Sequence, residues 1–209
     1  MTKRLNPIKV QRELTKRSIS MFSPLEFQRI FNVTKSAANF FINFHLKKGF
    51  FVKIRNGLYM LADYPANHYL IANRVYAPSY VSFDTALSFH GIIPETIYAV
   101  TSATTKITRE FKADNIRFVY HKLKKEVYTG YRAIKHSDNT VLMAEPEKAL
   151  ADYLYFVALK KRGLYYERLD LKKIKKPKLL SYVKLFKKHK MIELVEKIYV
   201  EFRKPKRIY

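Results

Sequence analysis

The chain has 209 residues, of which 48% are hydrophobic, so one large domain or two small ones can bury a core. Its 41 Lys and Arg against 17 Asp and Glu give a net charge of +24, which predicts a polyanionic partner such as DNA, RNA or an anionic surface. The absence of cysteine excludes disulfides and thiolate metal sites. No run approaches the roughly 18 apolar residues of a membrane span, and no apolar stretch follows the basic start, so we expect a cytoplasmic protein with no membrane partner.

The first 50 residues have the pattern of three helices joined by short turns. Pro7 opens a helix expected over Ile8–Ile19, on which Lys9, Arg12 and Lys16 share one face. These cations could contact phosphates as an accessory surface, or they could be the solvated side of the helix. Ser23 and Pro24 are typical N-cap and first-turn residues of a second helix.

The third helix is expected after a turn at Asn32–Thr34 and should run to about Lys48, where Gly49 stops it. Its pattern is amphipathic. The side expected to be buried contains Ala37, Ala38, Phe40, Phe41, Phe44 and Lys48, with His45 as a core histidine. The side expected to face outward contains Lys35, Ser36, Asn39, Asn43 and Lys47. Asn can pair with adenine and Lys can reach phosphate or guanine, as in a DNA recognition helix, although any amphipathic helix has a polar side.

Two short strand-like runs follow, Phe51–Ile54 and Leu58–Leu61, and the Asn56-Gly57 pair between them is a strong signal for a two-residue hairpin turn. A hairpin directly after the third helix predicts a winged helix-turn-helix. Its expected DNA-contacting residues are those of the outward side of the third helix together with Lys53, Arg55 and Asn56.

The rest of the chain predicts a second domain, so we expect domains at 1–64 and 65–209 and an α+β fold. Helices are expected at His68–Val75, capped by Asn67, at Phe83–His90, capped by Ser82, and at Pro146–Val157. Four strand-like runs predict a small antiparallel or mixed sheet. They are Ile97–Thr101, Ile116–Tyr120, Tyr131–Ile134 and Val141–Met143.

The last part of the chain predicts basic helices. Residues 171–192 contain nine Lys and no acid, interleaved with an apolar stripe. This run could be a second nucleic-acid surface, or a solvated face on packed helices. The candidate accessory residues there are Lys172, Lys173, Lys175, Lys176, Lys187 and Lys188.

Two segments carry a family resemblance: VYAPSYVSFDTALSFHGIIPE at 75–95 and AEPEKALADYLYF at 144–156. Together with the preceding NGLYML, they resemble the AbiEi-like antitoxins of type IV (abortive-infection) toxin–antitoxin systems, over most of residues 20–160. Glu145 departs from the pattern, because Ser is the usual cap before Pro-Glu-Lys.

The resemblance implies a two-part protein. The winged helix would bind inverted repeats in the promoter of its own operon and repress it. The C-terminal domain would counteract a nucleotidyltransferase-like toxin encoded next door, without a tight complex. The alternatives are a free-standing regulator whose second domain binds a ligand or partner, and an RNA-binding or nuclease protein.

The residues themselves give little sign of catalysis. The six histidines have no metal-ligand spacing, and five glycines form no phosphate-binding loop. Glu145, Glu147 and Lys148 faintly resemble a nuclease set that would need a further acid, for which Asp114 is a weak candidate. We therefore expect no enzyme activity, no cofactor and no metal.

Overall fold

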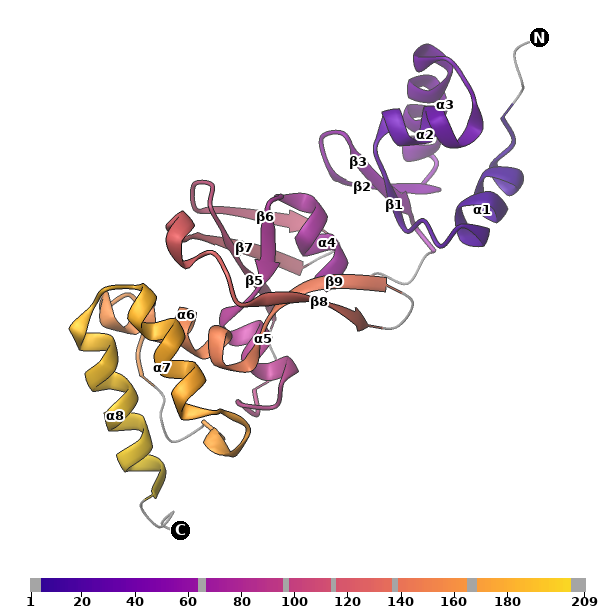
Figure 1. The fold of residues 1–209 in the computed structure, drawn as a ribbon. Helices are drawn as coiled ribbons and strands as arrows, with labels where there is room; N and C mark the ends of the chain where they lie inside the picture. Colours follow the sequence, from indigo (N-terminus) through magenta and orange to yellow (C-terminus); the bar gives the residue numbers. More distant parts are fainter. Residues whose placement is uncertain are drawn as a thin grey trace.

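The structure is a computed structural model that describes residues 5–63, 67–95, 98–113, 116–136, 139–164 and 169–203. In these ranges, eight α-helices and two β-sheets form an α+β fold, as the sequence predicts. Figure 1 shows an elongated molecule. An N-terminal unit lies at one end, a six-stranded sheet in the middle and the last two helices at the other end. The boundary expected at residues 64–65 lies outside the described residues.

The N-terminal unit contains the three predicted helices and the predicted hairpin, together with a short strand, β1 (Met21–Phe22), that was not predicted. It consists of α1 (Pro7–Lys16), β1 (Met21–Phe22), α2 (Pro24–Phe31), α3 (Lys35–Lys47), β2 (Phe51–Arg55) and β3 (Leu58–Leu61). The helix α1 ends before the expected Ile19, because the chain turns at Ser18, which has a positive φ of 52°.

Local hydrogen bonds explain where α2 and α3 begin. Ser23 and Glu26 form a reciprocal capping box at the start of α2. Asn32 ends that helix in the left-handed conformation, and the hydroxyl of Thr34 accepts from Ala37 N–H at the start of α3. The cap predicted at Ser23 and the turn predicted at Asn32–Thr34 are therefore confirmed.

The small sheet has the strand order β1-β3-β2, and its hairpin is the predicted one. Arg55 pairs with Leu58, which leaves Asn56 and Gly57 as the two turn residues, and Gly57 has a φ of +73°. An aromatic core joins this sheet to the helices: the ring centroids of Phe22 and Phe27 are 5.3 Å apart.

The central sheet is mixed, with the order β6-β7-β5-β4-β9-β8. Its strands are β4 (Ser79–Val81), β5 (Ala99–Thr104), β6 (Arg109–Ala113), β7 (Ile116–Lys122), β8 (Tyr131–His136) and β9 (Asn139–Ala144). The pairs β4–β9 and β5–β7 are parallel, and the others are antiparallel. The four predicted strands are present, except that the expected start at Ile97 lies outside the described residues. The edge strand β6 was not predicted.

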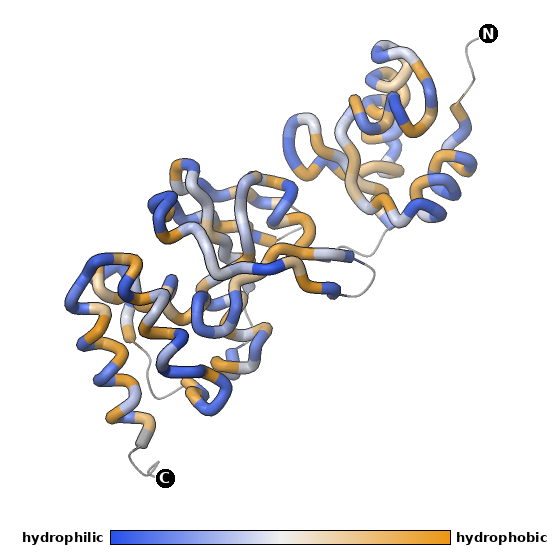
Figure 2. The backbone as a smooth tube through the Cα atoms, viewed as in Figure 1, coloured by the Kyte–Doolittle hydropathy of each residue, from blue (hydrophilic) through white to orange (hydrophobic). Residues whose placement is uncertain are grey.

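Helices pack around the sheet, and α6 is central among them. The elements are α4 (His68–Val75), α5 (Phe83–Phe89), η1 (Lys125–Val127), α6 (Pro146–Ala158), η3 (Leu171–Lys173), α7 (Lys176–Leu185) and α8 (His189–Arg203). The helix α6 lies against α5, α7 and α8. Hydrophilic and hydrophobic segments alternate along α7 and α8, as expected for amphipathic helices (Figure 2). No helix in the described ranges is long and apolar enough to cross a membrane.

The N-terminal unit and the rest of the chain share a hydrophobic core. Met21, Ile54 and Met60 of the small sheet belong to the same buried cluster as Ile71 and Val75 of α4. Beside this cluster, the guanidinium of Arg74 donates to Met21 O at 2.9 Å and to both carboxylate oxygens of Glu26 at 2.6 and 2.8 Å. The small sheet is therefore held directly against α4.

Candidate nucleic-acid interface

The exposed face of α3 contains most of the residues expected on it. Lys35, Ser36, Asn43 and Lys47 are exposed, whereas Asn39 is half-buried. The helix lies on the side of the N-terminal unit away from the central sheet (Figure 1). No acidic residue occurs between Lys35 and Lys53.

The buried face of α3 is not the predicted one. Phe40 and Phe44 were expected inside but are 73% and 43% exposed, and Lys48 is exposed as well. The buried positions are Ala38, Phe41, Ile42 and His45, at the i, i+3, i+4, i+7 spacing of a helix stripe. The helix is therefore rotated about its own axis from the expected orientation. The rotation is somewhat smaller than the angle between two consecutive residues of a helix.

The aromatic core explains this rotation. The ring of Phe41 lies 5.7 Å from that of Phe27 and 6.2 Å from that of Phe51, so it takes the space beneath the helix. Phe40 and Phe44 instead stack on each other outside, with centroids 6.1 Å apart and planes at 15°. The Lys48 ammonium lies 4.5 Å from the centre of the Phe44 ring.

His45 is a buried core residue, as predicted. Its ring centre lies 4.2 Å from that of Phe41. Burial, and secondarily the nearby charge of Lys48, lower its pKa below the ordinary 6.5. The imidazole is therefore neutral at pH 7 and adds no charge to the exposed face.

The hairpin residues Lys53, Arg55 and Asn56 are exposed, and Arg55 donates to Asn56 O at 2.8 Å. The strand β2 also lies beside β6 of the central sheet. Burial raises the pKa of Tyr120 in that sheet, and the charge of Arg55 partly opposes the rise. Arg55 is therefore close to the junction of the two units.

The accessory cations lie in two places. Lys9, Arg12 and Lys16 are exposed on α1, opposite buried Val10 and Leu14. The lysines of residues 171–192 lie at the end of the molecule opposite to α3 (Figure 1).

Part of the C-terminal lysine run is engaged by acids and backbone carbonyls from other elements. Lys176 pairs with Glu196 at 2.7 Å, and Lys173 donates to the carbonyls of His90 and Gly91. Lys172, Lys175, Lys187 and Lys188 are exposed. Lys187 and Lys188 line a hollow of about 330 Å³ with Tyr155 and Phe186. The lack of acids in the run does not mean a lack of acids around it.

The two segments that carry the family resemblance meet in a buried polar network. Lys148 donates to Asp152 Oδ1 at 2.5 Å within α6, and both side chains are fully buried. Tyr80 and Ser82 donate to Asp152 Oδ2 at 3.0 and 2.7 Å. Burial raises the pKa of Asp152, and burial together with the Asp152 charge raises that of Tyr80. Sequence reasoning missed Asp152 and Tyr80; a Lys and an Asp four residues apart in an apolar helix were the available signal.

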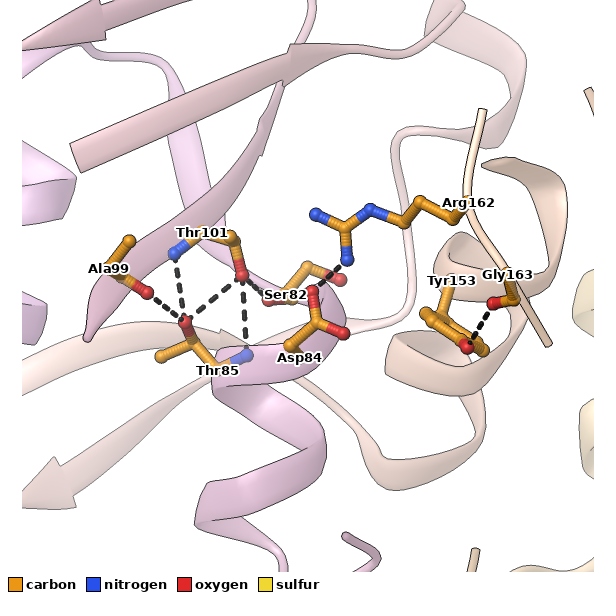
Figure 3. A network of polar contacts seen from close by, with 8 residues as sticks. All are labelled: Ser82, Asp84, Thr85, Ala99, Thr101, Tyr153, Arg162 and Gly163. Atoms are coloured by element: carbon orange, nitrogen blue, oxygen red, sulfur yellow. Dashed lines mark hydrogen bonds and ion pairs between the residues drawn. The ribbon is translucent and has the colours of Figure 1, made fainter. Parts of the chain in front are cut away.

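The expected role of Ser82 as the cap of α5 is wrong, because its hydroxyl is bound to Asp152. Figure 3 shows the contacts that hold the start of α5 instead. Thr101 of β5 donates from its hydroxyl to Ser82 O at 2.8 Å, and its backbone N–H donates to the Thr85 hydroxyl at 2.8 Å. Arg162 forms an ion pair with Asp84 on the same turn.

The residues of the faint nuclease pattern do not converge on an accessible site. Glu145 makes no cap bond and accepts instead from Arg132, Lys178 and Tyr182. Glu147 accepts from Lys175 N–H at 3.2 Å, and Lys148 is enclosed with Asp152. Asp114 lies outside the described residues. In the part of the chain that is described, no group of three or more His, Asp or Glu is arranged to hold a metal ion.

Comparison with models of protein families finds none that matches this chain, and comparison with curated proteins finds no match either.

Proposed function

We propose that the chain is an antitoxin of a type IV toxin–antitoxin system that represses its own operon through an N-terminal winged helix-turn-helix. In this proposal α2 and α3 form the helix-turn-helix and the β2–β3 hairpin is the wing. The helix α3 enters the major groove of promoter DNA, where Asn43 pairs with adenine and Lys47 reaches phosphate or guanine. Lys53 lies near the DNA backbone.

The observation that carries the DNA-binding half is the exposed face of α3. It presents amide, hydroxyl and ammonium groups, and neither α3 nor the chain from there to Lys53 contains an acid. Residues 5–63 contain ten Lys and Arg against three acids, and two of these acids are engaged, Glu13 by Arg17 and Glu26 by Arg74. A surface of this charge attracts a polyanion, and its amides supply groups that can distinguish bases.

The antitoxin half rests on the resemblance of residues 75–95 and 144–156. The buried network of Tyr80, Ser82, Lys148 and Asp152 is consistent with it, because all four residues come from those two segments. Their role is to hold α6 against the sheet, so the surface that acts against the toxin lies elsewhere on the domain. The proposal assigns no enzyme activity to the protein.

Gel shifts on DNA upstream of its own gene, at two salt concentrations, test the repressor half. We expect sequence-preferring binding that weakens as salt rises. Binding that is equal on unrelated DNA contradicts it. Co-expression with the neighbouring nucleotidyltransferase-like gene product tests the other half, and growth arrest that is not relieved contradicts it.

A second candidate function is a free-standing winged-helix regulator controlled by a ligand. A hollow of about 400 Å³ favours it, because amide, hydroxyl and imidazole groups from Asn67, Thr85, Ser88 and His136 line its wall. In that case co-expression leaves the toxin active, while DNA binding changes with a small molecule.

A further inference from the structure

Two phenylalanines stand on the face of α3 that is proposed to meet DNA. Phe40 lies four residues after Ser36 and three before Asn43, so all three side chains share one helix face. The ring of Phe40 is 73% exposed, and that of Phe44 stacks beside it. Because Lys48 lies over the Phe44 ring, the outer member, Phe40, is the more accessible of the two.

The charges around this pair limit what can cover it. Lys35, Lys47 and Lys48 are the charged side chains of the exposed face, and no acid follows until after Lys53. A second copy of the same face would bring cations against cations. The complementary partner is anionic, presents groups that Asn43 can pair with, and has small apolar groups at the same depth. The major groove of duplex DNA has these properties, because the C5-methyl of thymine projects into it beside the hydrogen-bonding edges.

We propose that Phe40, held by its stacking on Phe44, contacts thymine C5-methyl groups and thereby sets part of the sequence preference of this protein. The inference rests on the proposed function, since it requires α3 to lie in the major groove. It assigns thymine next to the base read by Asn43, because the two side chains are neighbours on the helix face.

The test removes the methyl group from the DNA. The full chain first selects its site from a random duplex pool, and each thymine of that site is then replaced in turn by deoxyuridine. We expect one or two replacements to weaken binding about fourfold each, the ratio for losing one buried methyl-sized group. Phe40→Ala should bind the thymine site more weakly and should no longer distinguish thymine from deoxyuridine. Phe40→Leu, which keeps an apolar contact, should retain part of the discrimination.

Two further variants control this test. Tyr98→Ala removes an aromatic ring that is 90% exposed outside the N-terminal unit, and it should keep the wild-type response. Phe44→Ala removes the stacking partner and should reduce the discrimination without abolishing binding. Since Phe40 is a surface residue, the unfolding curves of the two Phe40 variants should match that of the wild type.

Each result of the deoxyuridine test either supports or overturns the proposed contact between Phe40 and thymine. If the wild type binds a selected duplex but is insensitive to deoxyuridine at every position, or if Phe40→Ala is equally sensitive, this inference is overturned while the proposed function stands. If the chain prefers no duplex sequence, both fail. Tighter binding to single strands than to duplex also overturns the inference, in favour of base stacking on Phe40.

Discussion

The carboxylate of Glu145 ties three elements together at the start of α6. It accepts hydrogen bonds from Arg132 of β8 and from Tyr182 of α7, the latter at 2.6 Å, and it pairs with Lys178 at 2.8 Å. Burial alone would raise its pKa, but the bonds from Lys178, Tyr182 and Arg132 outweigh burial and lower the pKa to about 2. Glu145, which departs from the AbiEi-like sequence pattern, therefore links β8 and α7 to the start of α6 and does not cap that helix.

The contacts of the Glu145 carboxylate should make the free energy of unfolding depend on pH. A carboxyl whose pKa falls from 4.5 in the unfolded chain to about 2 in the folded one stabilises the fold fully above pH 4.5. The contribution is lost as pH falls from about 4.5 to 2. We expect Glu145→Gln to cost about 1–3 kcal/mol at pH 7, less than the full shift implies because Arg132 is well exposed and screened.

Denaturant unfolding of both proteins at several pH values measures this difference. The difference in the free energy of unfolding between wild type and Glu145→Gln should decrease steadily as the pH falls from about 4.5 to 2. Glu193→Gln, at an exposed contact with His189 in α8, is the control and should change the free energy of unfolding little. A gap that stays constant from pH 6 to pH 3 would show that Glu145 stabilises by packing alone.

The buried pair of Lys148 and Asp152 gives a second expectation at the scale of residues. Asp152→Asn keeps the shape and an acceptor for Tyr80 and Ser82, but it leaves the Lys148 ammonium buried without a counter-charge. Breaking a buried pair in this way costs about 3–5 kcal/mol. Adding Lys148→Met removes the stranded charge, so the double variant should recover much of that loss. Thermal and denaturant unfolding of the three proteins provides the measurement, and a double variant no better than Asp152→Asn contradicts the account.

At the scale of elements, the sequence predicts boundaries better than orientations. The starts of α2, α3 and α4 follow from local chemistry, since the side chains of Ser23, Thr34 and Asn67 each accept a hydrogen bond from a backbone N–H three residues later. The rotation of α3 does not follow from local chemistry. It is set by which phenylalanine packs against Phe27 and Phe51. The sequence alone does not distinguish Phe40, Phe41 and Phe44 for that role.

The difference between local and long-range interactions also explains why the strand β6 was not predicted and why Ser82 was wrongly expected to cap α5. The side chains of β6 are mostly exposed and charged, as suits the edge of a sheet, so the strand lacks the apolar alternation by which strands are recognised. Ser82 has the right type and place for a cap, but Asp152, 70 residues away in the chain, takes its hydroxyl. Long-range partners of this kind have no signal in local sequence.

The proposed DNA interface predicts two kinds of residue, those on α3 that read bases and those on the β2–β3 hairpin that contact the DNA backbone. We expect Asn43→Ala to weaken binding to the preferred site by about 1–3 kcal/mol and to relax the preference at one position, because an amide pairs with a particular base. Lys53→Ala should weaken all sequences alike and reduce the salt dependence by about one phosphate contact. Titrations of preferred and scrambled duplexes at several salt concentrations separate the two. Unchanged specificity in Asn43→Ala means that α3 does not read bases through that face.

At the scale of the whole molecule, the two ends of the chain carry different kinds of positive surface. The face of α3 combines ammonium groups with amides and aromatic rings, whereas the C-terminal helices present lysines that partly pair with Glu145, Glu147 and Glu196. In the proposed function, the first surface distinguishes DNA sequences, and the second attracts a polyanion without distinguishing its sequence. Whether both positively charged surfaces can bind one partner depends on how rigidly the two units are connected.

Arg74 contributes the ion pair and a backbone hydrogen bond to that connection, beside the shared apolar cluster. Partial burial alone would raise the pKa of Glu26, but bonds from Ser23 and Arg74 lower it, so the carboxylate stays charged and caps α2 while it holds α4. Arg74 is also the donor to Met21 O beside the shared core. Removing its side chain therefore affects a helix cap, a strand end and the junction of the two units together.

We expect Arg74→Ala to lower the free energy of unfolding by about 1 kcal/mol, since the ion pair is partly exposed, and to lower the melting temperature by roughly 2–4 °C. Arg17→Ala breaks the exposed pair with Glu13 inside α1 and should have a smaller effect. Proteolysis should also separate the two variants, because a loosened junction exposes Ile54 and Met60, which the shared core now buries. If Arg74→Ala is cleaved no faster than Arg17→Ala between the two units, the shared apolar cluster holds them together without the ion pair.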